Sequence, residues 1–201
     1  MITGAASGIG RATAERLAST GHRLVLFDCD ENALSETREA LAEGTEAIAI
    51  AGDVSDEADV GEMVHETKAH FGRLDDVVAN AGINGVWAPS GARRSASIIA
   101  DGVRTFTNPG ATAYSATKAA QVAMAQQLAL ELRKHRIRVN VICPGAVETN
   151  IAASSRIRNR AEAEVRVIWP QGSIPLTDGS LAKQPMLPRS SDFCSARRHR
   201  M

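Results

Sequence analysis

Short apolar runs alternate with longer, partly polar segments along most of this chain. The stretches Leu24–Asp28, Ala47–Ala51 and 77–79 are largely apolar and short enough to be strands. The segments between them carry apolar residues three and four positions apart, as helices do when one face packs on a sheet. Through residue 145 this alternation predicts an α/β fold with a doubly wound parallel sheet, in a single domain.

A glycine-rich turn precedes the first helical pattern. Residues 3–10 read Thr3-Gly4-Ala5-Ala6-Ser7-Gly8-Ile9-Gly10, with the glycines spaced Gly-x3-Gly-x-Gly. Glycine lets a backbone turn tightly and approach a ligand closely. The free amides and positive dipole end of the following helix suit a pyrophosphate. The alternative interpretation is an ordinary glycine-rich turn.

Two acidic residues stand at or just after the ends of predicted strands. Asp28 stands 18 residues after Gly10, where a dinucleotide-binding fold places the carboxylate that binds the ribose 2′-OH. An acid there repels a 2′-phosphate, so NAD is favoured over NADP; alternatively, Asp28 is only the polar end of a strand. Asp53 could meet an adenine edge or cap a helix, a role that Ser55 or Asp56 fills equally well.

A tyrosine and a lysine stand four positions apart in Tyr114-Ser115-Ala116-Thr117-Lys118, at the start of an alanine-rich helical pattern that runs to Leu132. Residues four apart share one face of a helix. A cation beside a phenol favours the phenolate and lowers the pKa of the tyrosine, which suits proton transfer. Alone, such a pair is more often an ordinary pair of helix neighbours.

The set of motifs resembles the short-chain dehydrogenase/reductase family, with a Rossmann-like fold. Besides the glycine turn, Asp53 and the Tyr114/Lys118 pair, it includes Asn80-Ala81-Gly82 and Pro144-Gly145, in matching order and spacing. The resemblance covers residues 2–89 and 103–179. Residues 138–145 look like the sixth strand of that fold and the loop after it.

The resemblance implies an NAD(P)-dependent oxidoreductase acting on an alcohol or carbonyl group. Tyr114 would be the catalytic acid or base, and Lys118 would hold the nicotinamide ribose and lower the pKa of Tyr114. A catalytically impaired remnant, or a nucleotide-binding module without turnover, is the alternative. The expected cofactor-binding residues are Gly4, Ser7, Gly8, Ile9, Gly10, Asp28, Asp53, Val54, Asn80, Ala81, Gly82, Tyr114, Lys118, Pro144, Gly145, Val147 and Thr149.

Composition limits the partners and the cellular location that we expect. The 201 residues are 44% hydrophobic with zero formal net charge, so nothing in the overall balance points to nucleic acid or a charged surface. Three cysteines (Cys29, Cys143 and Cys194) show no metal or disulfide spacing. With neither an apolar run of membrane-spanning length nor a signal peptide, we expect a cytoplasmic protein that acts on a small molecule, without metal, nucleic acid or membrane partners.

Two parts of the sequence depart from the family. Only two residues precede Thr3, so we expect a clipped first strand and an internal or misassigned start. Only 31 residues separate Gly82 from Tyr114, which indicates an internal deletion near 85–102 and leaves the fifth strand doubtful. The family's serine would fall near Ile98 or Ile99, where the nearest hydroxyl is Ser97. Its supporting asparagine belongs to the missing helix, whose loss also argues against the family's homo-oligomer.

The end of the chain departs as well. After residue 179 the apolar periodicity stops, so we divide the chain into a domain over 1–179 and a tail over 180–201 that lacks the last strand. The tail carries several arginines, and could be a disordered end or a basic nucleic-acid-binding segment. We favour a third hypothesis, a frameshift product, because a shifted reading frame can yield a family-like amphipathic helix. Reading the gene tests it.

The missing strands predict low stability. By resemblance the sheet order is 3-2-1-4-5-6-7, so strands 1 and 5 both lie inside the sheet. Backbone groups left unpaired in a core cost about 1–3 kcal/mol each, against net stabilities of about 5–15 kcal/mol. We therefore expect a marginally stable or unfolded chain.

Overall fold

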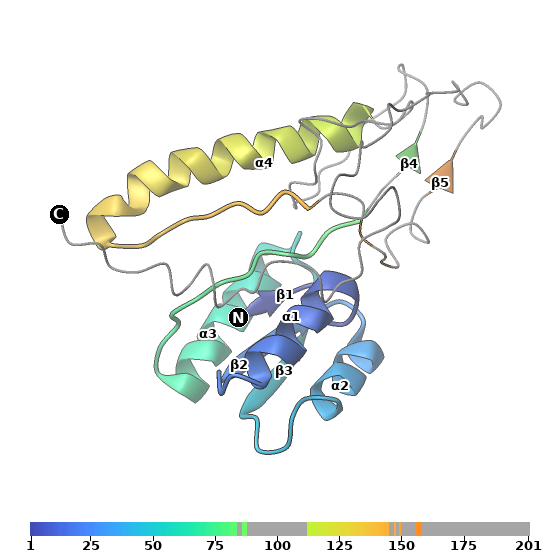
Figure 1. Cartoon of the computed structure of the whole chain (residues 1–201), viewed down its shortest axis with the longest axis vertical. Helices are drawn as coiled ribbons and strands as arrows, with labels where there is room; N and C mark the ends of the chain where they lie inside the picture. The colour runs from blue at the N-terminus through green and yellow to red at the C-terminus, as the bar shows by residue number, and fades with distance from the viewer. Residues whose placement is uncertain (84–85, 88–111, 145–146, 148, 150–155, 158–201) are drawn as a thin grey trace. The chain divides into compact units, whose positions relative to one another are not determined.

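The computed structural model describes residues 1–83, 86–87, 112–144, 147, 149 and 156–157 (Figure 1). The described residues fall into two compact units: residues 1–81, and those between 82 and 182.

The first unit is built on a parallel sheet. Strands β1 (Ile2–Thr3), β2 (Leu24–Asp28) and β3 (Ala47–Ala51) pair in the order β1-β2-β3. On the other side of β1, Ile2 forms a parallel bridge with Val78, and the Thr3 amide donates to the Val78 carbonyl at 3.0 Å. Val78, in the strand expected over 77–79, therefore lies beside β1, where the resemblance places the fourth strand, but it forms an isolated bridge and not a strand. The two-residue β1 pairs on both sides.

Three helices flank this sheet, and two of them begin at aspartate caps. Helix α1 (Gly8–Ala18) follows β1, α2 (Glu31–Glu39) follows β2, and α3 (Glu57–Phe71) follows β3. The Asp30 carboxylate accepts from the amide of Ala33 at the start of α2, and Asp56 accepts from Ala58 at the start of α3. Such caps satisfy amides that a helix leaves unpaired.

Alternate residues of β2 pack into two separate hydrophobic cores. Leu24 and Leu26 pack with apolar residues of α1 and α2, such as Ala14, on one face of the sheet. Val25 and Phe27 pack with Met63 of α3 on the other. Successive strand residues point to opposite faces, so this short apolar run is covered on both sides (Figure 1). A parallel sheet wound on both faces is the architecture that the alternation of elements predicted.

The second unit contains one long helix. Helix α4 (Thr112–Glu131) continues into the 3-10 turn η1 (Leu132–His135), which confirms the helix expected from Tyr114 to Leu132. Strands β4 (Val86–Trp87) and β5 (Arg156–Ile157) pair in parallel.

The sixth strand expected over residues 138–145 is not present over 138–144, where the structure has no regular secondary structure; residue 145 is outside the described residues. A run of apolar residues becomes a strand only when a neighbouring strand pairs with it, and the structure assigns 138–144 no such partner. The fifth strand, expected near 97–100, lies outside the described residues.

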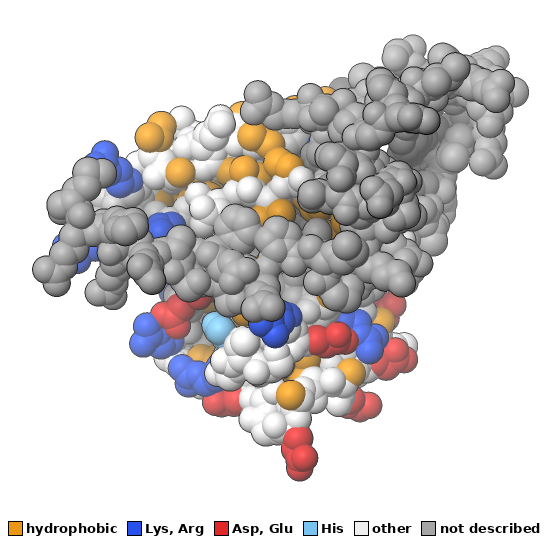
Figure 2. All heavy atoms as spheres, in the orientation of Figure 1, with side chains coloured by type: hydrophobic (Ala, Val, Ile, Leu, Met, Phe, Trp, Pro, Cys, Tyr) orange, Lys and Arg blue, Asp and Glu red, His pale blue; other side chains and the backbone are white. Residues whose placement is uncertain are grey.

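The surface differs between the two units. On the face shown in Figure 2, acidic and basic side chains intermingle over the first unit, whereas apolar side chains gather over α4. Met124 and Leu130 of α4 are 45% and 71% exposed. Among the helices in the described part of the chain, none has the length and apolarity needed to span a bilayer.

Candidate functional site

The turn between β1 and α1 depends on glycine at three positions. Gly4 and Gly8 have left-handed backbones, with φ of 67° and 54°, which glycine adopts without a steric penalty. A side chain on Gly10 would overlap the carbonyl oxygen of Gly4 and lie 2.6 Å from Nδ2 of Asn80. The turn therefore folds back on itself too closely for any side chain at Gly10.

Helix α1 begins at this turn with open amides. Its N-cap is Ser7, whose side chain makes no capping hydrogen bond, and its first turn holds no acidic residue. The first amides of a helix have no acceptor within the helix, and the helix dipole places partial positive charge there. The arrangement can therefore bind a phosphate group of a ligand through the backbone.

The carboxylate of Asp28 supports the same turn. Its Oδ2 accepts from the amide of Ala6 at 3.0 Å, and its Oδ1 accepts from the amide of Asp30 at 3.1 Å. Asp28 is half-buried at the end of β2, and each carboxylate oxygen retains a further lone pair. The residue therefore orders the glycine turn and can still accept hydrogen bonds from a ligand hydroxyl.

A polar clamp closes the turn from the other side of β1. The Asn80 side chain donates through Nδ2 to the carbonyl oxygens of Thr3 at 3.0 Å and Gly4 at 3.1 Å. In return, the Thr3 hydroxyl accepts from the amides of Asn80 at 3.0 Å and Ala81 at 3.1 Å. These four hydrogen bonds join segments almost eighty residues apart. The sequence placed Thr3 at the start of the glycine turn but did not indicate that its hydroxyl would bind the amides of Asn80 and Ala81.

Asp53 orders the turn after β3. Its Oδ1 accepts from both the amide and the hydroxyl of Ser55, each at 2.8 Å, and these bonds hold the pKa of Asp53 below its usual value. The cap of α3 is Asp56, so of the two roles considered for Asp53 the structure removes that of the helix cap. The neighbouring Val54 is 45% exposed.

The tyrosine–lysine pair lies on one face of α4. The Lys118 ammonium nitrogen is 5.2 Å from the centre of the Tyr114 ring, within the range of a cation–π interaction. Tyr114 is half-buried, whereas Lys118 is only 2% exposed. Lysines are almost never buried to this extent, and the other described lysines, Lys68 and Lys134, are exposed. The structure thus confirms the shared face that the spacing predicted.

A third polar residue of α4 is buried one turn further along. Gln121 is 7% exposed, and neither its Oε1 nor its Nε2 has a hydrogen-bonding partner among the described residues. Residues three and four apart share a helix face, so Gln121 follows Lys118 and Tyr114 along the same side. Its burial is not evident from the sequence, because a glutamine in a helix is ordinarily exposed.

The remaining expected site residues are only partly described. Pro144, Val147 and Thr149 are half-buried and Gly82 is exposed, while Gly145 and the serine candidate Ser97 lie outside the described residues. Among the residues that the structure covers, no group of histidine, cysteine, aspartate and glutamate could hold a metal ion.

Comparison with known proteins identifies the family. Residues 1–100 and 96–160 match the model of the short chain dehydrogenase family. The chain belongs to the short-chain dehydrogenase family.

Relatives of this short-chain dehydrogenase include named oxidoreductases. Oxidoreductase UcpA of Escherichia coli O157:H7 is 32% identical over 209 residues, covering 88% of this chain and 80% of that protein. Levodione reductase of Leifsonia aquatica is 31% identical over 192 residues, covering 77% of this chain and 71% of that protein.

Solved structures of other proteins resemble this chain in fold. A 3-ketoacyl-ACP reductase from Sinorhizobium meliloti 1021 superposes with a TM-score of 0.79 at 43% identity, covering 91% of this chain and 86% of that one. A short-chain dehydrogenase/reductase from Burkholderia phymatum in complex with NAD gives a TM-score of 0.70 at 28% identity, covering 88% and 75% of the two chains.

These findings confirm the Rossmann-like α/β fold and the assignment to a family of NAD(P)-dependent oxidoreductases acting on alcohol and carbonyl groups of small molecules. A nicotinamide cofactor is supported, because related structures hold NAD or NADP. The preference for NAD and the roles of individual residues are not decided by the comparisons, and they stay predictions.

Proposed function

We propose that this short-chain dehydrogenase transfers hydride between NAD and an alcohol or carbonyl substrate, with Tyr114 moving the proton. The observation that supports it most directly is the buried ammonium of Lys118, 5.2 Å from the centre of the Tyr114 ring. A cation in a poorly solvated position stabilises a nearby phenolate more strongly than it would in water. Tyr114 is therefore suited to act as a proton donor and acceptor near neutral pH.

The glycine turn fits the cofactor's pyrophosphate. The close approach at Gly10 and the open amides at the start of α1 leave backbone donors, with no acidic side chain in the first turn of α1. Gly4, Ser7, Gly8, Ile9 and Gly10 would form this cradle. The Thr3–Asn80 clamp would hold its shape.

The choice of NAD over NADP rests on Asp28. Its carboxylate is fixed by the amides of Ala6 and Asp30 and has lone pairs left for the ribose hydroxyls of NAD. The same negative charge would repel the 2′-phosphate of NADP.

The bound nicotinamide would supply or accept the hydride. In the direction of reduction, the Tyr114 hydroxyl would give its proton to the substrate oxygen as the carbonyl carbon receives hydride. In the direction of oxidation, the phenolate would take the proton from the alcohol. Lys118 would hold the nicotinamide ribose and lower the pKa of Tyr114. The remaining predicted contacts are Asp53, Val54, Asn80, Ala81, Gly82, Pro144, Gly145, Val147 and Thr149.

Binding and turnover are best tested separately. We expect NADH to bind the purified chain with enhanced cofactor fluorescence, and NADPH to bind more weakly. Asp28→Asn should narrow that difference, because it removes the repelling charge while keeping the size of the side chain. Equal affinities of the wild type for the two cofactors would refute the role of Asp28, and failure to bind either would refute the proposed function.

Turnover is tested with Tyr114→Phe, which keeps the ring that Lys118 contacts and removes the hydroxyl. A panel of carbonyl substrates can follow the relatives' names, with a dione and a 3-ketoacyl thioester. We expect wild-type oxidation of NADH with at least one carbonyl, and loss of that rate in Tyr114→Phe with NADH affinity unchanged. A wild type that binds NADH without turnover would instead favour the alternative, a nucleotide-binding module.

A further inference from the structure

The turn after β3 is held by Asp59, an acidic residue of α3 that is not among the predicted site residues. Oδ2 of Asp59 accepts from the amide of Asp53 at 2.8 Å. A Cβ added to Gly52 would lie 3.1 Å from the Cβ of Asp59 and 2.7 Å from the Phe27 ring. The Gly52 amide donates to the carbonyl of Asp28 at 2.9 Å. The turn is therefore packed between the end of β2 and the start of α3.

The simpler explanation for Asp59 is that an acid in the first turn of a helix interacts with the helix dipole. Glu57 and Asp59 of α3 both stand there. The hydrogen bond of Asp59 is a separate feature, because its donor Asp53 comes before the helix cap, Asp56. Asp56 itself accepts from the helix amide of Ala58 at 2.8 Å. The Asp59 bond therefore fixes the turn and not the helix.

Helix α3 gives Asp59 a fixed position. Met63 stands four residues further along and on the same helix face. It is 3% exposed and packs in the core with Val25 and Phe27 of β2. A group supported by a packed helix is held more precisely than one supported by a loop. The amide of Asp53 is thus tied to a rigid part of the first unit.

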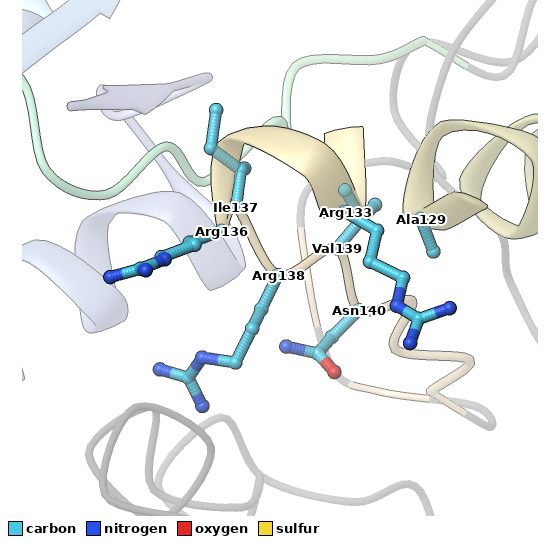
Figure 3. Close-up of a pocket in the computed structure, with 7 residues that line it drawn as sticks. All are labelled: Ala129, Arg133, Arg136, Ile137, Arg138, Val139 and Asn140. Atoms are coloured by element: carbon cyan, nitrogen blue, oxygen red, sulfur yellow. The ribbon is translucent and has the colours of Figure 1, made fainter. Parts of the chain in front are cut away.

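The basic residues after α4 are not arranged in this way. Arg133 and Arg136 line a pocket there, but both are exposed and their side chains point to opposite sides (Figure 3). They do not converge on one group, whereas the turn after β3 is fixed by hydrogen bonds.

The carboxylate of Asp53 has one oxygen that can meet a ligand. Its Oδ1 accepts from both the amide and the hydroxyl of Ser55, each at 2.8 Å. Within the described part of the chain no hydrogen bond reaches its Oδ2, and the residue is exposed. A carboxylate accepts hydrogen bonds and donates none. Oδ2 therefore favours a ligand edge with an amino group over one with a carbonyl oxygen.

The neighbouring strand ends indicate which part of the cofactor reaches Asp53. Asp28 and Ala51 are paired residues at the ends of β2 and β3, and adjacent strands are about 5 Å apart. Ligands of open α/β sheets bind at this edge. With the adenosine ribose bound at Asp28, the base attached to that ribose lies within reach of the turn after β3.

We propose that Asp59 is a positioning residue, which directs the Asp53 carboxylate toward the amino group of the cofactor's adenine. This role rests on the proposed binding of NAD. Hypoxanthine carries a carbonyl oxygen where adenine carries the amino group, and the carboxylate repels that oxygen. Loss of the Asp59 bond would free the turn, so the preference for adenine would fall although Asp53 itself is unchanged.

Fluorescence titration of the full chain with NADH and with its hypoxanthine analogue, deamino-NADH, tests this role. We expect the wild type to bind NADH about tenfold more tightly, the effect of one hydrogen bond to a charged acceptor. In Asp59→Ala, NADH should bind about three- to tenfold more weakly and deamino-NADH should change little, so that the preference falls below about threefold. Equal weakening of both ligands, with the preference intact, would show a general structural role and overturn the proposal.

Glu57→Ala is the matched control, because Glu57 is an exposed acid in the same helical turn and its replacement removes the same charge. We expect this variant to keep the wild-type preference. Asp59→Asn should keep it too, since an amide oxygen can still accept from the Asp53 amide. A preference lost equally in Glu57→Ala and Asp59→Ala would assign the effect to charge at the helix end, against the proposal.

The wild type separates this role from the function on which it rests. Failure to bind either ligand overturns the proposed function and the role of Asp59 together, whereas equal binding of both ligands overturns the role of Asp59 alone. If Asp59→Ala loses its helical circular dichroism, hydrogen exchange of the wild type decides. An Asp53 amide protected before NADH is added supports the role, and one that exchanges as fast as in an unstructured peptide overturns it.

Discussion

Thr3→Val isolates the hydroxyl that holds the glycine turn to the segment after Val78. Thr3 is buried, and its hydroxyl accepts from the amides of Asn80 at 3.0 Å and Ala81 at 3.1 Å. Valine has nearly the same shape and suits a strand equally well. The substitution therefore removes the acceptor of two hydrogen bonds and little else.

The expected loss of stability follows from these two amides. A buried donor left without an acceptor costs about 1–3 kcal/mol, so two donors give roughly 2–6 kcal/mol. Both bonds are only partly buried, and water can reach amides in such positions, which places the expected loss near 2–3 kcal/mol. That is a large part of the free energy of unfolding of an ordinary domain, which is about 5–15 kcal/mol.

Urea unfolding followed by circular dichroism gives the change in free energy, and hydrogen exchange of the Asn80 and Ala81 amides shows whether the loss is local. Thr3→Ser is the control, because it keeps the hydroxyl and removes only a methyl group. We expect faster exchange at both amides in Thr3→Val and a smaller effect in Thr3→Ser. Unchanged exchange in Thr3→Val, or equal destabilisation by both variants, would refute this reasoning.

Further predictions concern buried and titrating groups and the whole chain. Gln121→Leu should raise the urea midpoint, by about 1–3 kcal/mol in free energy, because it removes a buried amide without a described partner; a lower midpoint would contradict this. The pKa of Asp53 is lowered by its bonds to Ser55, so their contribution is present above the ordinary aspartate pKa and is lost as pH falls through the lowered value. Ser55→Ala should therefore destabilise the chain at pH 7 and much less at pH 3, and an equal effect at both pH values would contradict the assignment. Burial raises the pKa of the Cys29 thiol, and the charge of Asp28 raises it further, so Asp28→Asn should speed alkylation of Cys29 by iodoacetamide at pH 8; an unchanged rate would remove Asp28 as a cause. Finally, the short first strand predicts marginal stability, and a cooperative thermal melt with an ordinary midpoint would refute it.

The sequence predicted most accurately the elements that depend on local pattern. Strands β2 and β3 and helix α4 lie where the apolar runs and helical spacing placed them. The prediction of a sixth strand was wrong because a strand forms only where another strand pairs with it, and the local sequence does not specify that partner. The same apolar run at 138–144 has no regular structure, and Val141 and Ile142 are 38% and 43% exposed.

The sequence by itself determined the family, the glycine turn, the acid at Asp28 and the Tyr114/Lys118 spacing, because each depends on residue type and separation along one short segment. Only the tertiary structure showed that Asp28 and Asn80 fix the glycine turn through the backbone. The reason is physical: their partners are 22 and 76 or 77 residues away in the chain. A hydrogen bond depends on distance in space, and folding alone sets that distance.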